Sequence, residues 1–372
     1  EGAALLVNDN NALPLDDGNK ISLFSSSSVN VVYGGTGSAN VDASTCDNLK
    51  QAAEKSGFDI NETLWNFYAE GEASEYVRVE SSLFSSAETT IAEVPWDVYT
   101  DDVKASFAEY GDAAVVVLSR VGGEDDDLQY TTYNYLELND VEREMLENVK
   151  ALKNQGVFKK VIVLVNTSNA LEMDFLQGNP YGIDAVMWIG GVGSSGLNAV
   201  MDIMAGKINP SGSLVDTYCY DNFSAPAMVN FAPTMYGGWE ESGLSNTADT
   251  YMIYQEGIYV GYKYFETRYE DFVIGSGNPG KYAYAENVAF PFGFGLSYTT
   301  FEISDGSYSR CGEKIYVSAA VLNTGTVSGR EVVQIYCKQP QGKLGKSERI
   351  LCGFKKTKEL QPGESETVKI EI

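Results

Sequence analysis

Hydrophobic and polar positions in the first 215 residues alternate between two patterns. Continuous apolar runs occupy 21–24, 113–119, 161–165 and 184–190, as expected for strands that are buried on both faces. Helix-like stretches separate them at 41–57, 97–110, 139–155, 168–176 and after the glycine-rich turn at 191–196. The clearest is 139–155, where Asn139 is a typical N-cap and an apolar stripe follows at Val141, Met145, Leu146, Val149 and Leu152. Strands that alternate with helices predict a mostly parallel sheet covered on both faces.

The pattern changes after residue 215. Residues 216–298 are rich in Tyr, Asn and Gly and have little helical periodicity, so we expect a connecting segment packed on the first domain. From 299 to 372 short alternating runs such as KIYVSAAVLNTG and EVVQIYCKQ predict an all-β domain of the fibronectin III or immunoglobulin type. Only about five strands fit before Ile372 where such a sandwich has about seven, which predicts a truncated domain.

The predicted fold class is therefore α/β. It consists of a multi-layer α/β sandwich with a mostly parallel sheet over 1–215 and a partial fibronectin III-like β-sandwich over 299–372. The chain starts at Glu1 without an initiating methionine, so we expect a processed product or a fragment. The sequence does not decide between a cytoplasmic and a secreted protein.

Charge and composition exclude several classes of function. The net charge of −26 disfavours nucleic acid and anionic membranes as partners, and no apolar run approaches the ~20 residues of a membrane span. A neutral or cationic small substrate fits this charge better, although solubility alone also explains it. Histidine is absent, which removes Ser-His-Asp and Cys-His hydrolysis and every His-ligated zinc site. Acid–base chemistry would have to come from carboxylates, Tyr, Lys or Cys.

The segment RVGGEDDDLQYTTYNY at 120–135 carries the main candidate chemistry. It leaves the buried strand at 113–119 and crosses two glycines into four consecutive carboxylates, from Glu124 to Asp127. Four neighbouring acids repel one another, so we expect at least one raised pKa and a carboxylic acid able to donate a proton near neutral pH. The alternative is an acidic loop in solvent.

A second glycine-rich segment, GGTGSANV, follows the strand at 21–24 and precedes a predicted helix. A phosphate-binding loop is the alternative there, but the segment lacks both the Lys-Ser/Thr pair and the full GxGxxG pattern. The strongly negative chain is also a poor phosphate binder. We therefore expect no cofactor and no metal.

Eight segments in order along the chain resemble glycoside hydrolase family 3. They are EGAALLVNDNNALPL, GGTGSANV, VGGEDDDL, VIVLVNTSNALEM, GGVGSSGLNAVMDIMAGKINPSGSL, YQEGIYVGYKYFET, FPFGFGLSYTTF and VLNTGTVSGREVVQIY. The family combines a (β/α)8 barrel, an α/β sandwich and often a fibronectin III-like domain, and this chain resembles only the last two. GGTGSAN is similar to the family's domain-permuted group, which implies a barrel after Ile372 and makes that turn part of the substrate rim.

The resemblance implies part of a retaining, exo-acting β-glycosidase of the β-glucosidase type. Its acid/base would be Glu124, which matches the family's loop glutamate, although Asp125 stands where the family has a small residue. The nucleophilic aspartate, usually in a Ser-Asp-Trp context, has no match and would lie on the absent barrel. Sugar-contacting candidates are Arg120, Asp127, Tyr133 and Tyr135. The alternative for these residues is a structural role, in which the side chain is exposed to solvent, supports the loop or is buried in the ordinary way.

The expected partners are a β-linked oligosaccharide or aryl glycoside, and the missing barrel or a second chain that carries it. The sequence also leaves open whether the chain forms a homo-oligomer. A rival hypothesis is a non-catalytic binding or interface fragment that is inactive alone. A third, a flavodoxin-like binding protein with a β-sandwich appendage, explains the periodicity but not the eight motifs.

Overall fold

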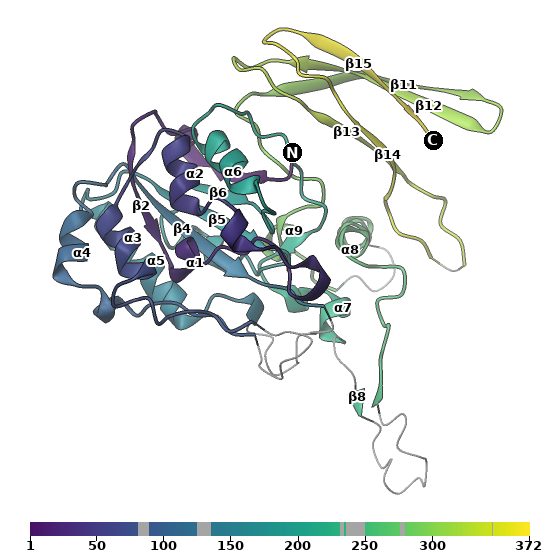
Figure 1. Cartoon of the computed structure of the whole chain (residues 1–372). Coiled ribbons are helices and arrows are strands. Elements are labelled where there is room, and N and C mark those ends of the chain that lie inside the picture. Colours follow the sequence, from purple (N-terminus) through teal and green to yellow (C-terminus); the bar gives the residue numbers. More distant parts are fainter. Residues whose placement is uncertain (81–88, 125–134, 231–233, 236–249, 276–279, 344) are drawn as a thin grey trace, which may run out of the picture.

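The computed structural model describes residues 1–80, 89–124, 135–230, 234–235, 250–275, 280–343 and 345–372 (Figure 1). Its first domain is built on a six-stranded sheet in the order β1-β6-β5-β4-β2-β3. These strands are β1 (Ala4–Asn8), β2 (Lys20–Phe24), β3 (Asp59–Ile60), β4 (Ala113–Arg120), β5 (Val161–Thr167) and β6 (Ala185–Trp188). All neighbouring pairs are parallel except β1 with β6, which confirms the predicted mostly parallel sheet.

Helices cover both faces of this sheet because successive residues of each central strand point to opposite sides. In β4, Ala114, Val116 and Leu118 enter one core, while the residues between them enter the other. The first core is covered by α3 (Glu62–Ala69), α4 (Asp101–Ser106) and α5 (Asp140–Asn154). The second is covered by α2 (Leu49–Lys55) and α6 (Gly196–Met204). Figure 1 shows α2 and α6 above the strands of this sheet and α3, α4 and α5 below them.

The strand order reverses direction between β2 and β4. From β2 the chain passes through α1 (Ser26–Val29) and α2 to β3 on one side, and β4, β5 and β6 then follow on the other side of β2. Because β2 and β4 are parallel neighbours, both end at the same edge of the sheet. Open α/β sheets bind ligands in the crevice at such a reversal, so this edge is where a site is expected.

The connecting segment 216–298 contains more helix than its sequence predicts. It includes β7 (Tyr218–Cys219), α7 (Pro226–Val229), β8 (Thr234–Met235), β9 (Thr250–Tyr251), α8 (Tyr262–Ile274), α9 (Tyr284–Asn287) and β10 (Val288–Phe290). In α8 only Phe265 is buried, so this helix does not pack a broad apolar face into a core. The pair β7–β10 attaches this segment to the first domain through the core residues Tyr218 and Phe290.

The C-terminal region is all-β, as predicted. One sheet has the order β11-β12-β15 and a second pairs β13 with β14, all antiparallel. The strands are β11 (Phe301–Cys311), β12 (Lys314–Asn323), β13 (Val332–Cys337), β14 (Ile350–Lys356) and β15 (Ser365–Glu371). A small core that includes Val321, Val333, Leu360 and Val368 lies between the two sheets.

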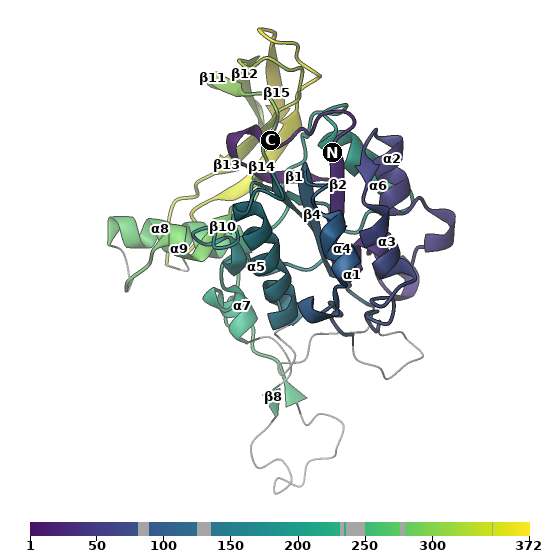
Figure 2. The ribbon, with the colours of Figure 1, turned by 90° about the vertical axis from the view of Figure 1, so that its left-hand side faces the viewer.

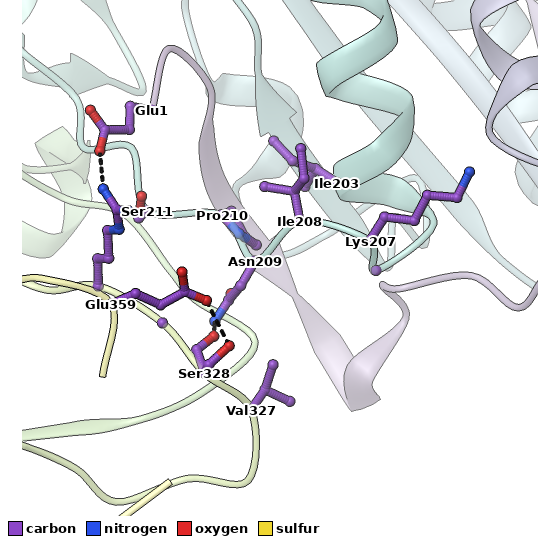
Figure 3. Close-up of a pocket in the computed structure, with 13 residues that line it drawn as sticks. Glu1, Ile203, Lys207, Ile208, Asn209, Pro210, Ser211, Val327, Ser328 and Glu359 are labelled. Carbon is purple, nitrogen blue, oxygen red and sulfur yellow. Dashed lines mark hydrogen bonds and ion pairs between the residues drawn. The ribbon is translucent and has the colours of Figure 1, made fainter. Parts of the chain in front are cut away.

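Polar contacts join this β domain to the loop after α6. Asn209 Nδ2 donates to Ser328 O at 2.9 Å, and Ser328 Oγ donates to Glu359 Oε1 at 2.9 Å (Figure 3). On the other side of Asn209, its Oδ1 accepts from Ser297 Oγ and from Tyr298 N. One asparagine thus links α6, the 297–298 turn and the β domain.

Three predicted helices differ in extent from the observed ones. The helix expected at 41–57 begins only at Leu49, because Asn48 forms a capping box with Gln51. The helix expected at 97–110 is the six-residue α4. The helix expected at 168–176 is wrong except for a 3-10 turn at Asp174–Leu176, since Glu172 N and Met173 N donate to Leu136 O and Cys219 O rather than within a helix.

Among the residues described, no helix combines the length and the apolar character needed to cross a membrane.

Candidate active site

Two loops from the strand-order reversal meet at the carboxyl edge of the sheet. Thr36, in the loop after β2, donates its backbone N–H to Gly122 O at 3.0 Å and forms an isolated parallel bridge with Gly123, in the loop after β4. Ser38, two residues after Thr36, contacts Glu124, two residues after Gly122. Ser38 Oγ and Ser38 N donate to Glu124 Oε2 at 2.6 and 2.9 Å. The predicted rim turn and the predicted acid loop are therefore one structural unit.

Glycines make this close approach feasible. A Cβ on Gly35 would lie 2.8 Å from Gly122 O, which is too close for any side chain. Gly37 has φ +77°, and a Cβ there would lie 2.8 Å from the Cβ of Glu124. Both positions therefore require glycine, one for space and one for space and backbone conformation together. Two glycines of GGTGSANV thus allow its loop to approach the 122–124 segment.

The pKa of the Glu124 carboxyl is lowered by its contacts with Ser38. Glu124 is exposed, and the hydrogen bond from the Ser38 hydroxyl, helped by the one from Ser38 N, lowers the pKa of its carboxyl below the usual value. Hydrogen bonds to the charged form favour ionisation. The other three acids of the run, 125–127, lie outside the described residues, so the expectation of at least one raised pKa among the four stays a prediction.

Arg120 lies in the protein interior, contrary to its predicted place at a sugar. Its side chain is fully buried, and Nη1 and Nη2 donate to Glu142 Oε1 and Oε2, each at 2.8 Å. Further bonds run from Nε to Tyr135 O and from Nη2 to Glu137 O. Every nitrogen of the guanidinium thus has a protein partner, and we interpret Arg120 as a positioning residue.

Tyr135 closes the same loop from its other end. Its hydroxyl accepts from Val121 N at 2.8 Å and donates to Val121 O at 3.0 Å, and its side chain is buried. The two ends of the 121–135 segment are therefore fastened to each other, which fixes where the acidic loop leaves the sheet. The remaining predicted site residues, Asp127 and Tyr133, lie outside the described residues, as does Asp125.

Asn166, at the end of β5, is a positioning residue that sequence analysis did not select. It is completely buried, and its Oδ1 accepts from Val32 N and from Ser119 Oγ, both at 2.7 Å. Its Nδ2 donates to Val32 O and Gly190 O at 2.9 and 2.6 Å. One amide thus ties the end of β4 to the chain segments that follow β2 and β6. A polar residue that ends the apolar run VIVLV was the available signal.

A second carboxyl near this edge was also missed. Glu172 follows β5 and is almost fully buried, with its Oε2 accepting from Asn222 N at 3.1 Å. Burial, together with the nearby carboxylates of Glu137, Asp221 and Asp174, raises its pKa to about 7. Nothing in the sequence separates Glu172 from an ordinary surface acid. In the described part of the chain, no group of three or more Cys, Asp or Glu residues is arranged to hold a metal ion.

Comparison with known proteins agrees with this geometry. Residues 3–262 match the model for the glycosyl hydrolase family 3 C-terminal domain, and residues 331–372 match a fibronectin type III-like domain. A β-glucosidase of Ruminococcus albus is 33% identical over the whole chain, which covers 35% of that protein. β-Glucosidase A of Butyrivibrio fibrisolvens is also 33% identical, and the chain covers 44% of it.

Solved structures give the same result. β-Glucosidase 3B from Thermotoga neapolitana, in complex with α-D-glucose, superposes with a TM-score of 0.77 at 30% identity. A β-glucosidase from Paenibacillus barengoltzii superposes with a TM-score of 0.79 at 31% identity. Each comparison covers 100% of this chain and 47% or 37% of the other protein. The chain thus spans less than half the length of these relatives, and from its matched domain and shared fold we conclude that it belongs to glycosyl hydrolase family 3.

Proposed function

We propose that this chain supplies the acid/base Glu124 of a retaining, exo-acting β-glucosidase, with the nucleophilic aspartate on a (β/α)8 barrel outside this sequence. The observation that carries the proposal is the double hydrogen bond from Ser38 to Glu124 at the strand-order reversal. It holds an exposed carboxylate on the edge where α/β sheets bind ligands. The proposed substrates are β-linked oligosaccharides and aryl β-glycosides.

In the proposed reaction, the barrel aspartate attacks the anomeric carbon while Glu124 protonates the departing glycosidic oxygen. Glu124 then removes a proton from the water that releases the sugar from the aspartate. Retention of configuration requires the two carboxyl groups about 5–5.5 Å apart. The anchored ends of the 121–135 segment limit how far Glu124 can move from the sheet edge.

The lowered pKa of Glu124 defines what the missing domain has to contribute. A general acid works best with a pKa near the operating pH, whereas Ser38 keeps this carboxyl ionised in the isolated chain. Cover by a barrel would desolvate Glu124 and place a second carboxylate beside it, and both effects raise its pKa. We therefore propose that the acid form arises only in the assembled enzyme.

The test uses the protein with its barrel and the variant Glu124→Ala. With 4-nitrophenyl β-glucoside, we expect kcat/KM to fall by about 10²–10⁴-fold. With 2,4-dinitrophenyl β-glucoside the first step should be nearly unaffected, because that leaving group needs no protonation. Added azide should restore turnover and yield β-glucosyl azide. Glu72→Ala, which removes an exposed carboxylate in the same domain, is the matched control.

Equal activity of Glu124→Ala and Glu72→Ala on the poorer leaving group would refute the acid/base assignment. The alternative function, a binding or interface fragment, predicts that Glu124→Ala leaves the assembled enzyme fully active. Under either proposal the isolated chain has no turnover, since the nucleophile is not on it.

A further inference from the structure

A cavity of about 650 Å³ lies between the connecting segment and the β domain, away from the Glu124 site. Its walls come from α8, the stretch from α9 to Phe292, and strands β11 and β13 with Arg349 before β14. Figures 1 and 2 both place α8 next to the β13–β14 pair. None of its lining residues belongs to the loops 34–38 or 121–124. Its volume is within the ~300–1,000 Å³ of typical small-molecule pockets.

Aromatic rings dominate the wall of this cavity. Tyr262 packs against Phe292 with ring centroids 4.7 Å apart, and against Tyr336 edge-on at 6.0 Å. On another wall, Tyr269 and Tyr284 pack with centroids 5.3 Å apart. The Tyr262 hydroxyl accepts from Leu351 N at 3.0 Å, which ties α8 to β14. The rings are therefore held by the structure around them.

Hydrogen-bond donors and acceptors line the same cavity. Glu266 is largely covered, and its Oε1 accepts from the Tyr284 hydroxyl at 2.6 Å while Oε2 lies 3.4 Å from Arg349 Nη1. Gln334 Oε1 accepts from the Tyr336 hydroxyl at 2.5 Å. Gly293 has φ +82°, and any Cβ there would overlap the Gln334 amide, so this turn is shaped around that side chain. One carboxylate and one guanidinium leave the lining without net charge.

We propose that this cavity binds a pyranose unit of a neutral oligosaccharide. The C–H faces of a pyranose ring are apolar and pack on aromatic side chains, while its hydroxyls both donate and accept. Glu266 and Gln334 offer acceptors, and Arg349 and the Gln334 amide offer donors. Arg349 is half exposed, so its ion pair with Glu266 is weak enough to be exchanged for a ligand hydroxyl. A balanced lining charge disfavours charged ligands.

A second cavity, between the loop after α6 and the β domain, lacks the same features. It is about 360 Å³, and its lining includes Ile203, Lys207, Asn209, Val327 and Ser328 but no aromatic ring (Figure 3). Without a stacking surface it offers a sugar only scattered hydrogen bonds. The proposed sugar site is therefore the aromatic cavity, and it does not depend on the catalytic role of Glu124.

The test is calorimetric titration of the full chain with cellotetraose and laminaritetraose. We expect saturable binding of at least one of them, and at least tenfold weaker binding by Tyr269→Ala and by Arg349→Ala. These two side chains are 42% and 53% exposed, so their removal should leave the fold intact, which circular dichroism checks. Tyr308→Ala, on the exposed side of β11 and outside the cavity, is the matched control and should bind as the parent chain does.

Trigalacturonate, an anionic oligosaccharide, should bind much more weakly than either neutral probe. Failure of both neutral probes to bind at millimolar concentration would overturn the proposal. So would binding that Tyr269→Ala and Arg349→Ala leave unchanged but Glu124→Ala abolishes, since that result would assign the sugar to the catalytic edge.

Discussion

Arg120 and Glu142 form a buried bidentate ion pair, with two guanidinium nitrogens each 2.8 Å from a carboxylate oxygen. Glu142 is also the N3 residue of the capping box that begins α5, where its Oε2 accepts from Asn139 N at 2.9 Å. One carboxylate therefore fixes both the start of a helix and the end of β4. Because Arg120 also holds the carbonyl oxygens of Tyr135 and Glu137, the pair determines how the acidic loop returns to the protein.

Breaking this ion pair should lower the free energy of unfolding. Arg120→Met leaves Glu142 as an unpaired buried charge, so we expect a loss of about 3–5 kcal/mol in the free energy of unfolding. Urea denaturation monitored by circular dichroism measures it. The double variant Arg120→Met/Glu142→Gln removes the stranded charge and should recover part of the loss. If the loss in the double variant equals the sum of the losses in Arg120→Met and Glu142→Gln alone, the ion pair is not the cause.

Ser38→Ala should raise the pKa of the Glu124 carboxyl, since the hydroxyl bond is the main cause of its depression. Titration by ¹³C NMR of the isolated chain measures this shift directly. In the assembled enzyme, the basic limb of the kcat/KM profile should move to higher pH, because the acid form would persist further.

Ser44→Ala is the control for that experiment. Ser44 donates its hydroxyl and its N–H to Asp42 Oδ1 at 2.6 and 3.0 Å, and these bonds lower the pKa of Asp42 in the same way. The control should raise the pKa of Asp42 and leave Glu124 unchanged. An unaltered Glu124 titration in Ser38→Ala would contradict the assigned cause.

Asn166→Leu should destabilise the chain by at least about 2 kcal/mol, because it leaves Val32 N, Val32 O and Gly190 O buried without this partner. Chemical denaturation measures the loss, and amide exchange at Val32 should become faster. Asn148→Ala removes an exposed side-chain bond to Glu144 O and should change stability by less than about 0.5 kcal/mol. Comparable effects of the two substitutions would show that Asn166 does not brace the strand ends.

Stability should fall as the pH rises from about 4.5 to 7, owing to Glu93. Burial raises the pKa of this carboxyl to about 7, against an ordinary value of 4.5 in the unfolded chain. Between these values the folded state binds more protons than the unfolded state, so rising pH favours unfolding by up to about 1.4 kcal/mol per pH unit. The loss is complete above the folded-state pKa.

Glu93→Gln should flatten that pH dependence when urea midpoints are compared between pH 5 and pH 8. The amide keeps an acceptor for Val94 N, which lies 2.8 Å from Glu93 Oε1, and it cannot ionise. Glu172, with a similar pKa of about 7, should leave a residual slope of the same sign. A slope in Glu93→Gln as steep as in the parent chain would exclude Glu93 as its source.

Local pattern was sufficient where one segment decides its own structure. The apolar runs became β2, β4, β5 and β6, and Asn139 caps α5 as predicted, because burial on both faces and N-capping leave direct traces in the sequence. The pattern was insufficient for α8, which buries only Phe265. It was also insufficient for 168–173, where backbone N–H groups donate to carbonyl oxygens far away in the sequence. Those elements depend on partners that local sequence does not specify.

The candidate site likewise combines features that the local sequence sets with features that only the tertiary structure sets. The sequence by itself determined the family, the strand ends and the identity of Glu124 as the candidate acid, because glycine-rich turns and collinear motifs are encoded locally. Only the tertiary structure decided that Ser38 lowers the pKa of the Glu124 carboxyl, that Arg120 and Tyr135 face inward, and that Asn166 braces the strand ends. The physical reason is that pKa, burial and hydrogen-bond partners are set by atoms far apart in the chain, which meet only where β2 and β4 end.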